Sequence, residues 1–139
     1  MRLLLHSELQ RQVADAALAA LPRECCGLIE GCIDGDVARI VAVHAAKNIS
    51  EDGTRFEIDP EDHIRVQKSA RANGREIVGC YHSHPNGRAT PSERDGDSED
   101  GFIWLIAAVA KEEIGLSAFR RFGGGWERLE MAEPAGKAA

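Results

Sequence analysis

Two histidines separated by one residue, His82 and His84, have the spacing in this sequence that most favours chemistry. They lie at the end of a run predicted to be a strand, Glu76 to Ser83, and the side chains of a strand alternate between its two faces. Both imidazoles should therefore emerge on one side, while Ser83 faces the other way. Pro85 then stops the strand, so the pair stands at its rim. Two neutral imidazole nitrogens that converge can ligate one metal ion, although a His-x-His pair alone is a weak signal.

Ser92 and Asp95 follow in the loop after the histidines and strengthen the metal interpretation. Asp95 can fold back as a third, anionic ligand, and three protein ligands plus a water form the open arrangement of a catalytic zinc site. A purely structural alternative exists, because Ser92 and Asp95 also have the spacing of a capping box at a helix start. The two interpretations are compatible, since a capping serine would hold the first turn and Asp95 with it.

The run from His82 to Asp95 resembles the JAMM signature of MPN-domain metalloproteases, which is His-x-His, seven residues, Ser, two residues, Asp. Glu24, in the segment Pro22 to Leu28, matches the upstream glutamate of that family. Its surroundings are similar to the Glu-x-Cys-Gly-Leu/Ile strand start of the small prokaryotic members. Residues 56–60 and 76–81 are similar too, so the resemblance covers nearly the whole chain, from about Leu3 to Leu129.

The resemblance implies a role for each matched residue. Zinc would be bound by His82, His84 and Asp95, with water in the fourth place, and zinc lowers the pKa of a bound water toward about 7. Glu24 would take the proton of that water and deliver it to the leaving amine. Ser92 would donate a hydrogen bond to the oxyanion. Without the resemblance, Glu24 would be interpreted as a solvated charge between a helix and a strand.

Two other groups of residues compete for these roles. Glu30 points to the same predicted strand face as Glu24 but stands about 20 Å further along, at roughly 3.3 Å per residue, so only one of them can reach the metal. The family match selects Glu24. The four cysteines contain no Cys-x-x-Cys pair and are expected to be buried reduced thiols rather than a thiolate zinc site or disulfides. They are Cys25, Cys26, Cys32 and Cys80.

The resemblance implies a zinc-dependent metallopeptidase or isopeptidase. Its substrate would be the bond after the C-terminal Gly-Gly tail of a small ubiquitin-like or sulfur-carrier protein. The alternative is a non-catalytic MPN scaffold or protein-interaction module, although every ligand position is filled here. A nucleobase deaminase would need His-x-Glu and Pro-Cys-x-x-Cys, and the sequence has neither. After Asp95, relatives commonly continue into an alanine-rich helical turn, whereas residues 96–101 are acidic and bracketed by glycine, which alters the expected floor of the substrate groove.

Local patterns predict the elements that position these residues. A helix over 8–21 has Ser7 as its N-cap, and a second helix begins after Asp59 and ends at Asn73-Gly74. Strands are predicted at 25–33, 37–44, 76–83, 102–110, 116–122 and 126–131, with a long loop over 85–101. Short turns between several strands indicate an α/β sandwich with a mixed or antiparallel sheet flanked by helices. The resemblance implies the MPN-type, cytidine-deaminase-like version of that sandwich.

Composition limits what the chain can be. Its 139 residues fit one domain, predicted as residues 1–131 with a flexible tail at 132–139, and 43% hydrophobic with 29% charged residues argues against disorder. A net charge of -6 works against nucleic-acid binding. The longest apolar run, Phe102 to Ala110, is too short to span a membrane, and Leu3-Leu4-Leu5 is too short for a signal peptide. We therefore expect a cytoplasmic protein without membrane contact, whose oligomeric state the sequence leaves open.

Overall fold

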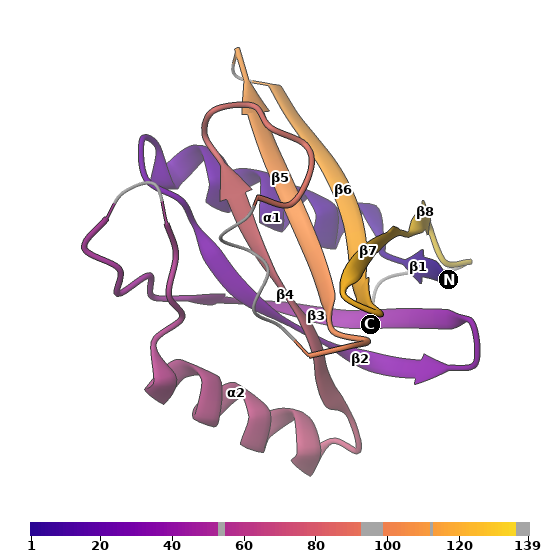
Figure 1. The fold of residues 1–139 in the computed structure, drawn as a ribbon. Coiled ribbons are helices and arrows are strands. Elements are labelled where there is room, and N and C mark those ends of the chain that lie inside the picture. Colours follow the sequence, from indigo (N-terminus) through magenta and orange to yellow (C-terminus); the bar gives the residue numbers. More distant parts are fainter. Residues whose placement is uncertain (53–54, 93–98, 112, 136–139) are drawn as a thin grey trace.

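A single mixed sheet dominates the computed structural model of the chain, which describes residues 1–52, 55–92, 99–111 and 113–135 (Figure 1). Within these residues eight strands follow the spatial order β7-β6-β5-β4-β2-β3-β1-β8. Their bounds are β1 (Arg2–Leu4), β2 (Cys26–Asp34), β3 (Val37–Ala46), β4 (Glu76–His84), β5 (Ile103–Ala110), β6 (Glu113–Phe122), β7 (Gly125–Arg128) and β8 (Glu130–Ala132).

Strand β4, which carries the two histidines, lies in the middle of this sheet. It pairs antiparallel with β2 and parallel with β5, while β2 with β3 and β5 with β6 form antiparallel pairs. The predicted mixed sheet is therefore confirmed. The register places His82 beside Ile106 and His84 beside Ala108, so the end of β4 is flanked by apolar residues of a central strand.

The two helices cover different faces of the sheet. Helix α1 (Ser7–Ala20) packs through Leu9, Val13 and Ala17 into a core that includes Tyr81 and Leu105. Figure 1 shows α1 behind β4, β5 and β6, with α2 (Pro60–Ala72) along the near side of β2 and β4. Side chains alternate along β4, so Cys80 and His82 lie on the face opposite Tyr81. That face is the one covered by α2.

Local capping signals explain where the helices begin and end. Asp59 caps α2 as predicted, with Oδ1 accepting from the backbone N–H of Glu61 at 3.0 Å, and Gly74 follows its end with φ +72°. The predicted N-cap of α1 is wrong by one residue. His6 has extended backbone angles and its Nδ1 accepts from the N–H of Glu8 at 3.2 Å, so the cap is His6 and Ser7 is already helical.

Short strands lie near both ends of the chain. β1 was not predicted, whereas β8 overlaps the end of the predicted strand over 126–131. β1 lies between β3 and β8 and runs parallel to both. The predicted strand over 126–131 is two strands, β7 and β8, and ordered pairing reaches Ala132, whose carbonyl accepts from the N–H of Leu5 at 2.9 Å. The backbone N–H of Ser7 also donates to Glu133, so structure extends past the predicted boundary at residue 131. Neither helix is long and apolar enough to cross a membrane among the residues described.

Candidate active site

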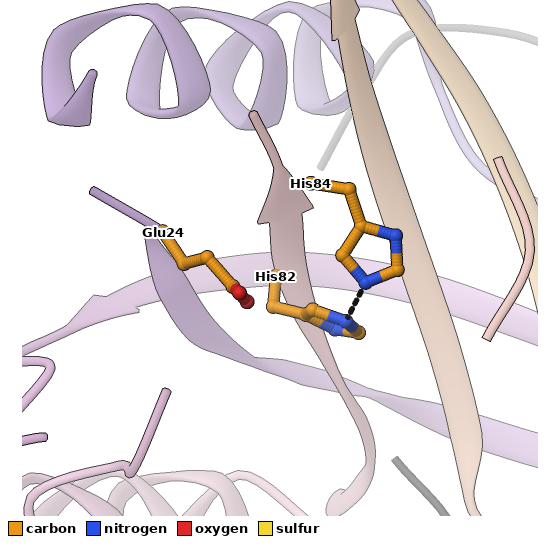
Figure 2. A group of neighbouring side chains, drawn as sticks. All are labelled: Glu24, His82 and His84. Atoms are coloured by element: carbon orange, nitrogen blue, oxygen red, sulfur yellow. Dashed lines mark hydrogen bonds between the residues drawn. The ribbon is translucent and has the colours of Figure 1, made fainter. Parts of the chain in front are cut away.

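Glu24, His82 and His84 converge at one end of β2 and β4, as Figure 2 shows. One ligand-type atom from each side chain lies within 4.8 Å of the other two, and the residues are 8%, 0% and 6% exposed. The sequence is thus correct that the two histidines emerge together, and the fold brings Glu24 to them from 58 residues away. A buried carboxylate beside two buried imidazoles is costly unless the group binds a cation or hydrogen-bond donors.

Strand register explains why these three side chains meet. Cys26 is paired with His82, and the next step back pairs Cys25 with Ser83, so Glu24 lies opposite His84. Alternation then points Glu24, His82 and His84 to one face of the sheet. Ser83 faces the other way, as predicted.

The ring nitrogens are arranged as a metal site requires. Nδ1 of His84 lies 2.8 Å from the carbonyl oxygen of Arg88, and since a carbonyl only accepts, Nδ1 carries the proton and leaves Nε2 as the electron-pair donor. That Nε2 lies 2.9 Å from Nε2 of His82. Two tetrahedral ligands held 2.0–2.1 Å from zinc would lie about 3.3 Å apart, so a shift of a few tenths of an ångström accommodates the ion. Two imidazoles and a carboxylate are a donor set that suits zinc.

An aromatic wall, formed by Phe56 and Trp104, encloses His82. The Phe56 ring stacks on the imidazole with centroids 4.5 Å apart and planes at 19°, and Trp104 meets its edge at 5.4 Å. The two wall residues also contact each other at 5.7 Å. The wall fixes the plane of the His82 ring and shields the ring from solvent. No role for either residue was predicted from the sequence, because they come from a loop and a strand 48 positions apart.

A groove of about 550 Å³ begins at this wall and runs along the sheet beneath α2. Its floor is largely apolar, with Leu28, Ile77 and Phe102, and its rim carries polar side chains of α2 such as His63 and Gln67. Phe56 and Trp104 line the groove as well, so it shares a boundary with the metal-type cluster.

Comparison with known proteins decides the family. The model of prokaryotic homologs of the JAB domain matches residues 6–122. This chain belongs to that family. The resemblance to small prokaryotic JAMM/MPN proteins is therefore confirmed, and so is the α/β MPN fold.

Several known proteins are similar to this chain over a large part of its length. The desampylase of Haloferax volcanii is 33% identical over 90 residues, which is 63% of each protein, and that of Pyrococcus furiosus is 32% identical over 85 residues, 60% of this chain and 58% of the relative. The match thus spans less than two thirds of either desampylase. Human deubiquitinase MYSM1 is 33% identical over 95 residues, 67% of this chain but 11% of that protein. A solution structure from Desulfitobacterium hafniense superposes with a TM-score of 0.85 at 27% identity, covering 95% of this chain and 92% of the other.

The remaining two positions of the JAMM signature, Ser92 and Asp95, lie in the segment after the histidines. Ser92 is partly buried at the end of the described stretch 55–92. Asp95, the predicted third ligand, lies outside the described residues, as do residues 96–98 of the acidic segment. The oxyanion role of Ser92 and the ligand role of Asp95 therefore stay predictions.

Glu30 has a structural role in this JAB domain. Its carboxylate is buried and lies 2.9 Å from Nε2 of His44 and 3.3 Å from a guanidinium nitrogen of Arg75. It is absent from the group of metal-type ligands found among the described residues, to which Glu24 belongs. Glu24 thus lies with the two histidines and Glu30 does not, and the catalytic role of Glu24 stays a prediction.

All four cysteines are free thiols. Cys25, Cys26 and Cys80 are buried as expected, but Cys32 is exposed because it lies toward the outer end of the β2–β3 hairpin. Burial raises the pKa of Cys26 to about 12, and burial also raises the pKa of Cys25. The two thiols beside Glu24 are therefore neutral at physiological pH, which suits packing rather than thiolate metal binding.

Proposed function

We propose that this protein is a zinc-dependent metallopeptidase or isopeptidase. Its substrate would be the bond that follows the C-terminal Gly-Gly tail of a ubiquitin-like or sulfur-carrier protein. The convergence of Glu24, His82 and His84 in one buried cluster is the observation that carries the proposal. Relatives named desampylase and deubiquitinase support a hydrolase that acts on ubiquitin-like conjugates.

His82 and His84 would hold the zinc ion through their Nε2 atoms, and Asp95 would complete the protein ligands. Zinc bound there would lower the pKa of a coordinated water and polarise the scissile carbonyl. The protein contributes the fixed orientation of the ligands. The carbonyl of Arg88 holds the tautomer of His84, and the Phe56 stack holds the ring plane of His82.

Glu24 would act as the general base and then as the general acid. Its carboxylate lies on the same sheet face as the histidines, so it can accept a proton from the attacking water and pass it to the leaving amine. Such proton transfer typically contributes 10²- to 10⁴-fold to the rate. Ser92 would donate a hydrogen bond from its hydroxyl to the oxyanion, a contact worth about 10²- to 10³-fold. No nucleophilic side chain is required for this chemistry.

Glycines before the scissile bond are consistent with the crowding at the site. Phe56 and Trp104 stand against His82, and a residue without a Cβ passes such a wall most closely. The apolar groove that begins there can take the extended residues that precede the glycines. With a net charge of -6, the protein also favours a partner that presents a basic face.

A cleavage assay tests the proposal. Ubiquitin-like and sulfur-carrier proteins fused through their Gly-Gly tail to a short extension, or to a lysine side chain, are incubated with zinc-loaded protein and examined by mass spectrometry. We expect cleavage directly after the second glycine. Glu24→Gln should retain one zinc per chain and lose at least about 10²-fold in turnover. Glu30 is a buried carboxylate in β2, the strand that follows Glu24, and Glu30→Gln should stay within about threefold of wild type.

Two outcomes would contradict the proposal in different ways. If zinc is bound stoichiometrically but no Gly-Gly fusion is cut, the substrate assignment fails. If the metal-replete protein holds less than one zinc per chain and His84→Ala leaves that amount unchanged, the protein is the non-catalytic scaffold considered above.

A further inference from the structure

The peptide bond between Glu24 and Cys25 is held at both of its polar atoms by side chains from other parts of the chain. Nδ2 of Asn48 donates to the carbonyl oxygen of Glu24 at 3.0 Å, and the hydroxyl oxygen of Ser83 accepts from the N–H of Cys25 at 2.8 Å. We propose that Asn48 and Ser83 are positioning residues that set the place of the Glu24 carboxylate. This inference rests on the proposed function, in which Glu24 moves the proton.

The amide of Asn48 uses its full hydrogen-bonding capacity of two donors and two acceptor lone pairs. Its second donor contact goes to the carbonyl oxygen of Arg55 at 3.1 Å. Its Oδ1 accepts from the N–H groups of Ser50 and Glu57, each at 3.0 Å. Asn48 therefore ties Glu24 to the loop between β3 and α2, and that same loop carries Phe56.

Ser83 approaches the same peptide bond from β4. Ser83 lies between the two histidines in the sequence and is fully buried. Its backbone N–H donates to the carbonyl oxygen of Cys25 at 3.2 Å. β4 therefore positions both the Ser83 hydroxyl, which accepts from the Cys25 N–H, and the two histidines. Through this contact the position of the histidines and the position of Glu24 become one rigid unit.

The position of the carboxylate depends on this clamp because Glu24 lies just before β2 begins at Cys26. With both polar atoms of the following peptide bond held, the plane of that peptide and the position of the Glu24 Cα at its edge are fixed, which restricts where the side chain can begin. A misplacement of about 1 Å at a reacting group can cost about 10²-fold in rate. A loosened clamp should therefore lower kcat while leaving metal binding and substrate binding intact.

Three substitutions separate this role from simple structural support. Asn48→Asp is isosteric and keeps the acceptor oxygen for Ser50 and Glu57. It loses the donor contacts to the carbonyl oxygens of Glu24 and Arg55. Ser83→Ala removes the hydroxyl that accepts from the Cys25 N–H and that also contacts the Cys25 thiol. Ser50→Ala is the matched control, because among the described residues the hydroxyl of Ser50 makes its hydrogen bonds with Asp52 of the same loop.

The first measurement is the steady-state kinetics of cleavage, on a Gly-Gly fusion that the wild-type protein cuts. Asn48→Asp and Ser83→Ala should each lower kcat by about 10- to 100-fold, with KM within about threefold and one zinc per chain retained. Ser50→Ala should match wild type. In a Glu24→Gln background the two clamp substitutions should cause no further loss, because the group that they position is already absent.

Amide hydrogen exchange gives a second measurement that needs no activity. The Cys25 N–H should be protected in wild type and should exchange at least about tenfold faster in Asn48→Asp, although that substitution does not touch the N–H itself. The Leu28 N–H, deeper in β2, should keep its protection. Faster exchange throughout β2 would mean general destabilisation, and that result would overturn the proposal.

The two measurements distinguish the inference from the proposed function. If the wild-type protein cuts none of the fusions, the proposed function fails. Independently of activity, an unchanged exchange rate of the Cys25 N–H in Asn48→Asp overturns the inference about Asn48. If wild type is active, a kcat loss that persists undiminished in the Glu24→Gln background overturns the inference and leaves the proposed function standing.

Discussion

Replacing Gly27 by alanine should lower the free energy of unfolding far more than the same substitution at an exposed position of a strand. Gly27 lies in β2 opposite Tyr81, and the tyrosine ring covers the place where a side chain would stand. A Cβ added there would lie 2.1 Å from Cε2 and 2.3 Å from Cζ of Tyr81, and 2.5 Å from the carbonyl oxygen of His44. The substitution therefore meets a core ring and backbone at once.

The size of the effect follows from these distances. Carbon atoms pack best at about 3.5–4.0 Å, so the ring of Tyr81 would have to move by roughly 1.5 Å. The ring is 2% exposed and has no solvent to move into. Overpacking a core usually costs about 1–3 kcal/mol, and the second obstacle at His44 is backbone, so we expect a loss near 3 kcal/mol. For a domain of this size that corresponds to a Tm lower by roughly 10 °C.

Urea and thermal unfolding in the presence of a chelator measure this loss without a contribution from bound metal. Gly115→Ala is the matched control, because Gly115 also lies in a strand and nothing stands within 4 Å of its added Cβ. That variant should remain within about 0.5 kcal/mol of wild type. If Gly27→Ala is as stable as Gly115→Ala, the tyrosine ring can move aside and the packing argument is refuted.

Three further predictions concern the thiols and the aromatic wall. Because burial raises the pKa of Cys26 to about 12 from its ordinary value of 9.0, the unfolded thiol ionises first as the pH rises. The free energy of unfolding should fall above pH 9, by up to about 1.4 kcal/mol per pH unit, and less steeply in Cys26→Ala, as urea titrations under reducing conditions would show. Cys32 is the exposed thiol and should react with a thiol reagent at pH 8 at least about tenfold faster than the buried three, which peptide mapping would detect. Phe56→Ala removes the ring stacked on His82 and should weaken zinc binding about 10-fold in a chelator competition, since groups that orient metal ligands typically contribute that much.

Each of these three has an outcome that contradicts it. An equal slope of stability against pH in wild type and Cys26→Ala would show that the thiol ionises alike in both states. Labelling of Cys26 as fast as Cys32 would mean that β2 opens readily. Unchanged zinc affinity in Phe56→Ala would mean that the His82 ring is held without the stack.

Local signals in the sequence predicted the two helices and the central strands to within a few residues. The limits of α2 follow from Asp59 and Gly74, whose capping geometry involves only neighbours in the chain. The β6–β7 hairpin is closed by Gly123 and Gly124, both with positive φ, in the run of three glycines that separates the predicted strands over 116–122 and 126–131. Such features depend on hydrogen bonds and steric limits within a few residues, so they are readable from the sequence.

Strand β1 escaped prediction, and β8 was predicted only as the end of a longer strand, because each has only three residues and no periodic pattern. They exist because the two ends of the chain pair with each other and with β3, and such pairing depends on the completed sheet. The role of Asn48 escaped for the same reason, since its four hydrogen bonds reach Glu24 and three points of its own loop only in the folded protein.

The sequence by itself determined that His82 and His84 share a face, because the two-residue period of a strand requires it. The spacing to Ser92 and Asp95 supplied the family. Only the tertiary structure decided that Glu24 reaches the histidines, because the register of β2 against β4 places residues 58 positions apart side by side. The same is true of the wall formed by Phe56 and Trp104. Contacts of this kind depend on which buried arrangement packs best, and that is a property of the whole domain rather than of any segment.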